Sequence, residues 1–88
     1  MIKTKITIAN NAGLHARAAA KLVGITSGFS CSVKIGGDKL VDGKSILSLM
    51  MLAANKGTEL NVIVDGEDER EALQAVNTLV ENLFDEGQ

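Results

Sequence analysis

The sequence contains no proline, tryptophan or tyrosine, and its only aromatic residues are Phe29 and Phe84. The interior of the folded chain must therefore be mainly aliphatic. There is also a single cysteine, Cys31, and a single histidine, His15. One cysteine cannot form an internal disulfide, and one cysteine with one histidine supplies too few ligands for a zinc site. We therefore expect a buried free thiol at Cys31, no metal site and no cofactor.

Long hydrophobic runs and concentrated positive charge are absent too. No segment approaches the roughly 20 apolar residues of a membrane-spanning helix, and the N-terminus lacks the apolar core of a signal peptide. The formal net charge is −2, and the nine Lys and Arg residues are scattered along the chain. A nucleic-acid-binding domain gathers its positive charge on one surface. These absences predict a cytoplasmic protein that neither inserts into a membrane nor binds nucleic acid.

The apolar residues that are present follow regular patterns over the 88 residues, a length that suits a single globular domain, residues 1–88. Alternation predicts strands, and recurrence at helical spacing predicts helices. The resulting order is β-α-β-β-α-β-α, and a sheet covered on one side by helices would bury every apolar face. Strands are expected at 2–8, 31–35, 39–41 and 59–65, and helices at 16–27, at 45–57 and over the 72–83 pattern.

His15 stands between a turn-like run and an alanine-rich run. Asn10, Asn11 and Gly13 favour a turn after the first strand, so His15 falls at or next to the N-cap of the first helix. The backbone N–H groups at a helix start have no intrahelical partner, and together with the helix dipole they attract an anion. The segment therefore predicts an anion-binding position at the histidine.

Arg17 adds a permanent cation with a fork of donors that suits phosphate oxygens. A neutral ring nitrogen of His15 could attack a phosphoryl group while these donors neutralise the incoming charge. A covalent phosphohistidine is thus a coherent hypothesis. From the residues alone, a solvated surface histidine beside a solvated arginine remains the alternative.

The segment "AGLHARAAAKLV" resembles the phosphorylation-site motif of HPr, the histidine-containing phosphocarrier family of the bacterial phosphoenolpyruvate-dependent phosphotransferase system. The family core reads Gly-Leu-His-x-Arg-Pro-Ala. The resemblance continues through "GKSILSLMML" and "KGTELNVIVDGEDEREAL", and so covers nearly the whole chain. It implies an open-faced sandwich in which three helices cover one face of a four-stranded antiparallel sheet. The residues that match the core are Gly13, Leu14, His15, Arg17 and Ala19.

The resemblance also implies a function. His15 would accept a phosphoryl group on Nδ1 from enzyme I and pass it to a IIA-type component, without turnover of its own, and we expect the carrier to be a monomer. Arg17 and the backbone N–H groups of Ala16, Arg17 and Ala18 would hold the phosphate. Ala18 replaces the proline of the family motif. Alanine restores an N–H group and helix propensity, so phosphate binding should survive, while the rigidity of the site and its match to partners are affected.

Ser45 precedes an apolar run and is expected to cap the second helix through its side-chain oxygen. The resemblance implies a second role for Ser45 as a regulatory serine phosphorylated by HPr kinase/phosphorylase. The cap alone would also explain the residue.

The second helix is unusually apolar, because only Ser48 is polar from Ile46 to Ala54. A helix on a sheet needs one apolar stripe, so some of these side chains must face outward. An exposed, methionine-containing patch suits a surface that meets several partners. The resemblance implies a docking surface made of Leu14, Ile46, Leu47 and Met50. An over-hydrophobic helix packed under a loop is the alternative.

The sequence also allows two functional classes other than a phosphocarrier. A small ligand-sensing module could use the glycines near residues 36 and 57 to line a pocket, but the Gly-Leu-His-x-Arg segment and the third helix argue against it. A purely regulatory relative that acts by docking alone is disfavoured by the presence of His15. "SLMMLAANKG" and "LFDEGQ" are somewhat similar to paralogues of a nitrogen-related phosphotransferase chain. That branch and the sugar-uptake branch both stay open.

Overall fold

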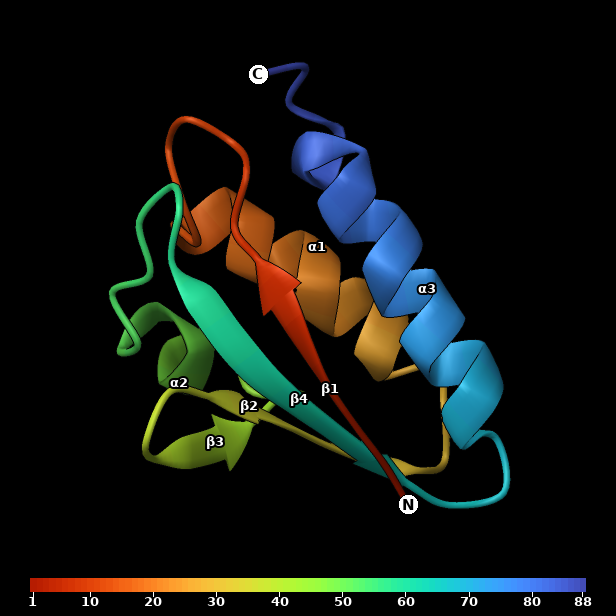
Figure 1. The fold of residues 1–88 in the computed structure, drawn as a ribbon. Coiled ribbons are helices and arrows are strands. Elements are labelled where there is room, and N and C mark those ends of the chain that lie inside the picture. The colour runs from red at the N-terminus through yellow and green to blue at the C-terminus, as the bar shows by residue number, and fades with distance from the viewer.

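The strands and helices follow one another in the expected order β-α-β-β-α-β-α (Figure 1). A computed structural model describes residues 1–88. No helix in it is long and apolar enough to cross a membrane. The elements are β1 (Ile2–Thr7), α1 (Ala16–Thr26), β2 (Ser32–Gly36), β3 (Leu40–Asp42), α2 (Ile46–Met50), β4 (Glu59–Asp65), α3 (Glu69–Glu81) and a short 3₁₀ turn, η1 (Leu83–Asp85).

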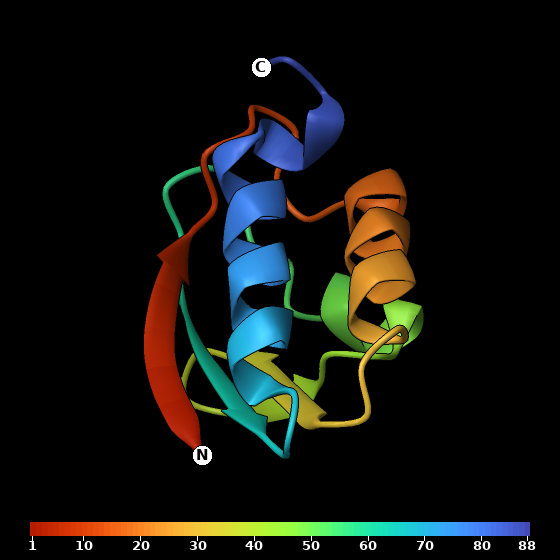
Figure 2. The same cartoon turned by 90° about the vertical axis from the view of Figure 1, so that its right-hand side faces the viewer.

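The sheet has the strand order β1-β4-β2-β3, and every neighbouring pair is antiparallel. Alternate side chains point to one face, where Val33 lies opposite Val64 and Ile35 opposite Val62, all of them buried. All three helices lie on this face (Figure 2). The two-layer architecture expected from the sequence is therefore confirmed.

The core is aliphatic, as the scarcity of aromatic residues predicted. Phe84 is the only aromatic residue among its 19 buried members. Cys31 is a buried free thiol, also as predicted, and burial together with the neighbouring Asp68 raises its pKa. The Asp68 carboxylate accepts hydrogen bonds from the backbone N–H groups of Ser30, at 2.7 Å, and Cys31, at 2.9 Å. It thereby ties the start of α3 to the start of β2.

The prediction of a second helix reaching Gly57 was wrong. α2 ends at Met50, and the chain then turns, with Ala53 at a φ of +51°. The physical reason is tertiary: the Ala54 carbonyl accepts a hydrogen bond from the N–H of Leu14 at 2.8 Å, and the Gly57 N–H donates to the Ile8 carbonyl at 2.6 Å. A helix continued to Gly57 would have paired the Gly57 N–H with the Ala53 carbonyl. That N–H instead holds the end of β1, and the segment leaves the helix to make these contacts.

α2 is anchored mainly by one side chain, and this generates a stability prediction. Leu49 is fully buried, whereas Leu47 is 69% exposed. We expect Leu49→Ala to lower the free energy of unfolding by about 2–5 kcal/mol, because it leaves a core cavity. The matched Leu47→Ala control should change it by no more than about 0.5 kcal/mol. Urea unfolding measures both, and equal losses would contradict the packing described here.

Candidate functional site

His15 is held by the loop between β1 and α1. Next to it, Leu14 is 4% exposed, and its backbone N–H donates to the Ala54 carbonyl. Gly13 has a φ of +72°, and a Cβ atom placed there would lie 2.5 Å from the Ala54 carbonyl oxygen. Only glycine allows the two backbones to approach this closely. The buried leucine and the glycine together bring His15 to the first turn of α1.

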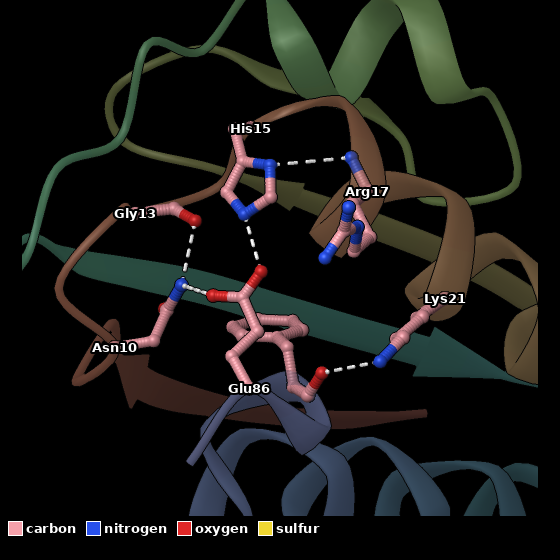
Figure 3. Close-up of polar contacts among 7 residues, drawn as sticks. Asn10, Gly13, His15, Arg17, Lys21 and Glu86 are labelled. Atoms are coloured by element: carbon pink, nitrogen blue, oxygen red, sulfur yellow. Dashed lines mark hydrogen bonds and ion pairs between the residues drawn. The ribbon is translucent and has the colours of Figure 1, made fainter. Parts of the chain in front are cut away.

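The His15 ring occupies the N-cap position that the sequence predicted. Its backbone is extended, and Nδ1 accepts a hydrogen bond from the backbone N–H of Arg17 at 3.3 Å. The side chain is 35% exposed. On the far side of the ring, Nε2 is hydrogen-bonded to the Glu86 carboxylate (Figure 3). Both ring nitrogens therefore have a partner.

Glu86 reaches the ring because the C-terminal segment folds back over the site. Leu83, Phe84 and Asp85 all have positive φ values, between +54° and +62°, a conformation that costs L-residues energy. Two contacts offset this cost: the Phe84 side chain is fully buried, and its carbonyl accepts a hydrogen bond from Lys21 Nζ at 3.1 Å. The tail is thus anchored on the core and on α1.

Asn10 lies beside the Glu86 carboxylate and is hydrogen-bonded to it (Figure 3). Asn10 has no exposed surface, and its Nδ2 donates to Glu86 Oε1 and to the Gly13 carbonyl, both at 2.8 Å. The Asn10 hydrogen bond is the main cause that holds the pKa of Glu86 below its ordinary value, followed by the hydrogen bond and charge of His15 and the charge of Lys21. Asn10 Oδ1 is buried without a partner.

An open hollow of about 500 Å³ lies over this cluster. Two cations, Arg17 and Lys21, line it from successive turns of α1, and His15 lines it as well. Such a hollow can receive an anion that exchanges with solvent and with partners. Its remaining lining comes from the loop and the tail: Asn11, Ala12, Asp85, Glu86 and Gln88.

The backbone amides expected to bind phosphate lie in different environments. Ala16 and Arg17 are exposed at the start of α1. Ala18 has no exposed surface and belongs to the core. Its amide therefore does not face the hollow in this conformation. The methyl group that replaces the family's proline ring packs inward rather than lining the site.

The expected docking residues also separate into two groups. Leu14 is buried, so in this conformation it holds the loop and offers no surface. Ile46, Leu47 and Met50 are 41%, 69% and 40% exposed, which confirms that α2 turns apolar side chains outward. Ser45 caps α2, because its Oγ accepts a hydrogen bond from the Ser48 N–H at 3.2 Å. The serine thus stands beside the exposed patch.

Sequence reasoning missed Lys21 and Glu86 and assigned Asn10 only to a turn. The available signal was the final "LFDEGQ" segment, in which a large apolar residue follows an amphipathic helix and precedes acidic residues. Phe84 is the anchor in that segment. Nothing in the local pattern indicated that the acidic residues after it return to the histidine.

Comparison with known proteins gives a consistent result. The family model described as the PTS HPr component phosphorylation site matches residues 2–82. The phosphocarrier protein HPr of Pseudomonas putida is 54% identical over 86 residues, which is 96% of each chain. The crystal structure of HPr-C-His from Thermoanaerobacter tengcongensis has a TM-score of 0.93 at 39% identity, over 98% of both chains. An HPr dimer from the same organism has a TM-score of 0.76 at 39% identity, over 96% of this chain and 98% of that one.

The link between Asn10 and Glu86 predicts a pH effect. Folding lowers the pKa of Glu86 below its ordinary value of 4.5. The ionised Glu86 carboxylate therefore stabilises the folded state above that pH. This stabilisation is lost as the pH falls through the lower pKa that Glu86 has in the folded state. Asn10→Ala should raise the pKa of Glu86 towards 4.5 and weaken this pH dependence. Carboxyl-carbon NMR titration measures the pKa. Asn11→Ala, an exposed neighbour, is the control, and an unchanged Glu86 titration in Asn10→Ala would refute the link.

Proposed function

Because the chain belongs to the HPr family, and is accordingly a phosphocarrier of the phosphotransferase system rather than an enzyme with its own turnover, we propose that His15 carries the phosphoryl group on Nδ1. The observation that supports this most directly is the position of the ring. His15 caps α1 and lines a hollow that Arg17 and Lys21 also line. A phosphoryl group on Nδ1 would extend into this cationic hollow.

The first turn of α1 supplies the charge stabilisation in this proposal. The Arg17 N–H, which donates to Nδ1 at 3.3 Å, is released when phosphorus takes the Nδ1 lone pair, and it can then donate to a phosphoryl oxygen, as can the exposed Ala16 N–H. The Arg17 guanidinium provides a charge-assisted fork to the same group. The buried Ala18 amide would join only after a local rearrangement.

We propose enzyme I as the donor and a IIA-type component as the acceptor, with the exchange taking place in the cytoplasm. We also propose that the carrier works as a monomer, because Asn10, His15 and Glu86 can contact one another within a single chain. Sugar uptake or its regulation is the main proposed pathway, and a nitrogen-related phosphotransferase chain is the alternative.

The docking surface in this proposal consists of Ile46, Leu47 and Met50. All three are exposed on α2, and α2 contacts α1, the helix that begins at the histidine. An apolar patch beside the phosphoryl group allows a partner to bury it and to exclude water while the group is transferred. Because donor and acceptor would use the same patch, they must bind in turn.

Labelling with enzyme I and labelled phosphoenolpyruvate tests the assignment of His15. We expect one acid-labile phosphate, absent from His15→Ala because no other histidine exists in the chain. Arg17→Ala should slow labelling by about 10- to 100-fold, since a hydrogen bond to a charged group contributes about 1.5–3 kcal/mol. Acid-stable label, or label that persists in His15→Ala, would overturn the assignment.

We also propose that Ser45 is a regulatory phosphorylation site for HPr kinase/phosphorylase. Its hydroxyl is partly exposed beside Ile46 and Leu47. A phosphate there would place about two negative charges at the edge of the apolar patch and hinder its desolvation by a partner.

Incubation with ATP and HPr kinase should give an acid-stable phosphate that is lost in Ser45→Ala. Ser48→Ala is the matched control, because Ser48 lies on the same helical turn. The phosphorylated carrier should accept a phosphoryl group from enzyme I more slowly than the unmodified one. No incorporation into the wild type would leave Ser45 with its capping role alone.

A further inference from the structure

The two nitrogens of the His15 ring have different partners, and the chemistry of those partners fixes where the proton lies. Glu86 is ionised near neutral pH and can only accept a hydrogen bond, so Nε2 must donate to it. The Arg17 N–H can only donate, so Nδ1 must present its lone pair to it. The contacts therefore select the tautomer with the proton on Nε2 and a free electron pair on Nδ1.

Glu86 is itself held in place, as an orienting group must be. Its side chain is 13% exposed, and its second oxygen accepts a hydrogen bond from the buried Asn10 at 2.8 Å. The turn before it is anchored by the burial of Phe84 and by Lys21. The carboxylate cannot swing away from the ring without breaking these contacts. Asn10 therefore orients Glu86, and Glu86 in turn orients the His15 ring.

We propose that Glu86 is a positioning residue that keeps the ring proton of His15 on Nε2 throughout phosphoryl transfer. The inference rests on the proposed role of His15 as carrier. It makes Nδ1 the only nucleophilic nitrogen in the free protein. It also keeps the phosphorylated ring in its protonated form, from which the phosphoryl group departs readily because neutral imidazole is the leaving group.

The proton and the electrons balance in both directions. In the forward step, the bond between phosphorus and the donor atom of phosphorylated enzyme I breaks, that atom keeps the electron pair, and the Nδ1 lone pair forms the new bond to phosphorus. Nδ1 carries no proton, so none has to leave. The ring becomes a phosphorylated imidazolium whose proton stays on Nε2 against Glu86. In the return step, a lone pair of the acceptor atom on the IIA-type component forms the new bond to phosphorus, and the Nδ1–P electron pair goes back to Nδ1.

Few other charged groups surround the ring. On the α1 side, Arg17 and Lys21 line the hollow, and from the tail Asp85 faces it without a hydrogen bond to His15. The loop from residue 10 to 14 carries no ionisable side chain. Lys56, on the segment packed against that loop, donates to Asn11 Oδ1 at 2.9 Å instead. Glu86 is thus the one anion in contact with the ring.

The variant Glu86→Gln tests the proposal while preserving the size of the side chain. Its amide oxygen can still accept from Asn10, which turns the amide NH₂ towards Nε2 and favours the opposite tautomer. Glu81→Gln is the matched control, since it makes the same substitution at an exposed carboxylate of α3 that does not line the hollow. Nitrogen-15 NMR of the ring should report Nε2–H in the wild type and in Glu81→Gln, and a shift towards Nδ1–H in Glu86→Gln.

The kinetic readout is phosphorylation by enzyme I. In Glu86→Gln, kcat should fall by about 10- to 100-fold with little change in KM, while Glu81→Gln stays near wild type. A wrong histidine tautomer in a buried serine-protease triad lowers the rate roughly 10⁴-fold. We expect a smaller loss here, because the His15 ring is partly exposed to water. Hydrolysis of the phosphorylated Glu86→Gln carrier should also need a lower pH than in the wild type.

Results against the positioning role of Glu86 can be told apart from results against the carrier function of His15. Equal behaviour of Glu86→Gln and Glu81→Gln, or faster labelling of Glu86→Gln, would overturn the positioning role, the latter by showing that the carboxylate only repels phosphate. In either case a labelled wild type and an unlabelled His15→Ala would leave the carrier function intact. Failure of the wild type to accept phosphate from enzyme I would instead remove the proposed function, and the inference with it.

Discussion

A pair of backbone hydrogen bonds between the loop after β1 and the segment after α2 holds the site together. The Leu14 N–H donates to the Ala54 carbonyl at 2.8 Å, and the Gly57 N–H donates to the Ile8 carbonyl at 2.6 Å. The close approach requires glycine at position 13. Because the segment after Met50 makes these contacts, α2 is short and stands near the start of α1. One tertiary contact thus determines both the position of the histidine and the neighbourhood of the exposed apolar patch.

The C-terminal tail completes the site from the opposite end of the sequence. The chain ends beside the loop that precedes α1, whereas the N-terminus lies at the other end of the molecule (Figure 1). Phe84 contributes the only aromatic ring of the core, and its burial stabilises a left-handed turn that would otherwise be unfavourable. Phe84, which looks like an ordinary core position in the sequence, therefore places the Glu86 carboxylate against the His15 ring.

The charges of the site suit a group that must be both accepted and released. Arg17 and Lys21 face the hollow, while Glu86 contacts the other edge of the ring. Partial exposure of His15 lets water screen these charges, so that each contributes modestly. A carrier benefits from this balance, because a phosphoryl group bound by buried cations would be held too tightly to pass on.

The sequence by itself determined the order of elements, the two-layer fold, the buried thiol at Cys31 and the N-cap position of His15, because these depend on local periodicity and turn chemistry. Only the tertiary structure decided the early end of α2 and the contact between His15 and Glu86. Both arise between segments far apart in the chain, 71 positions in the second case. Local patterns carry no information about such pairs, since backbone partners and a returning tail are chosen by how the whole core packs.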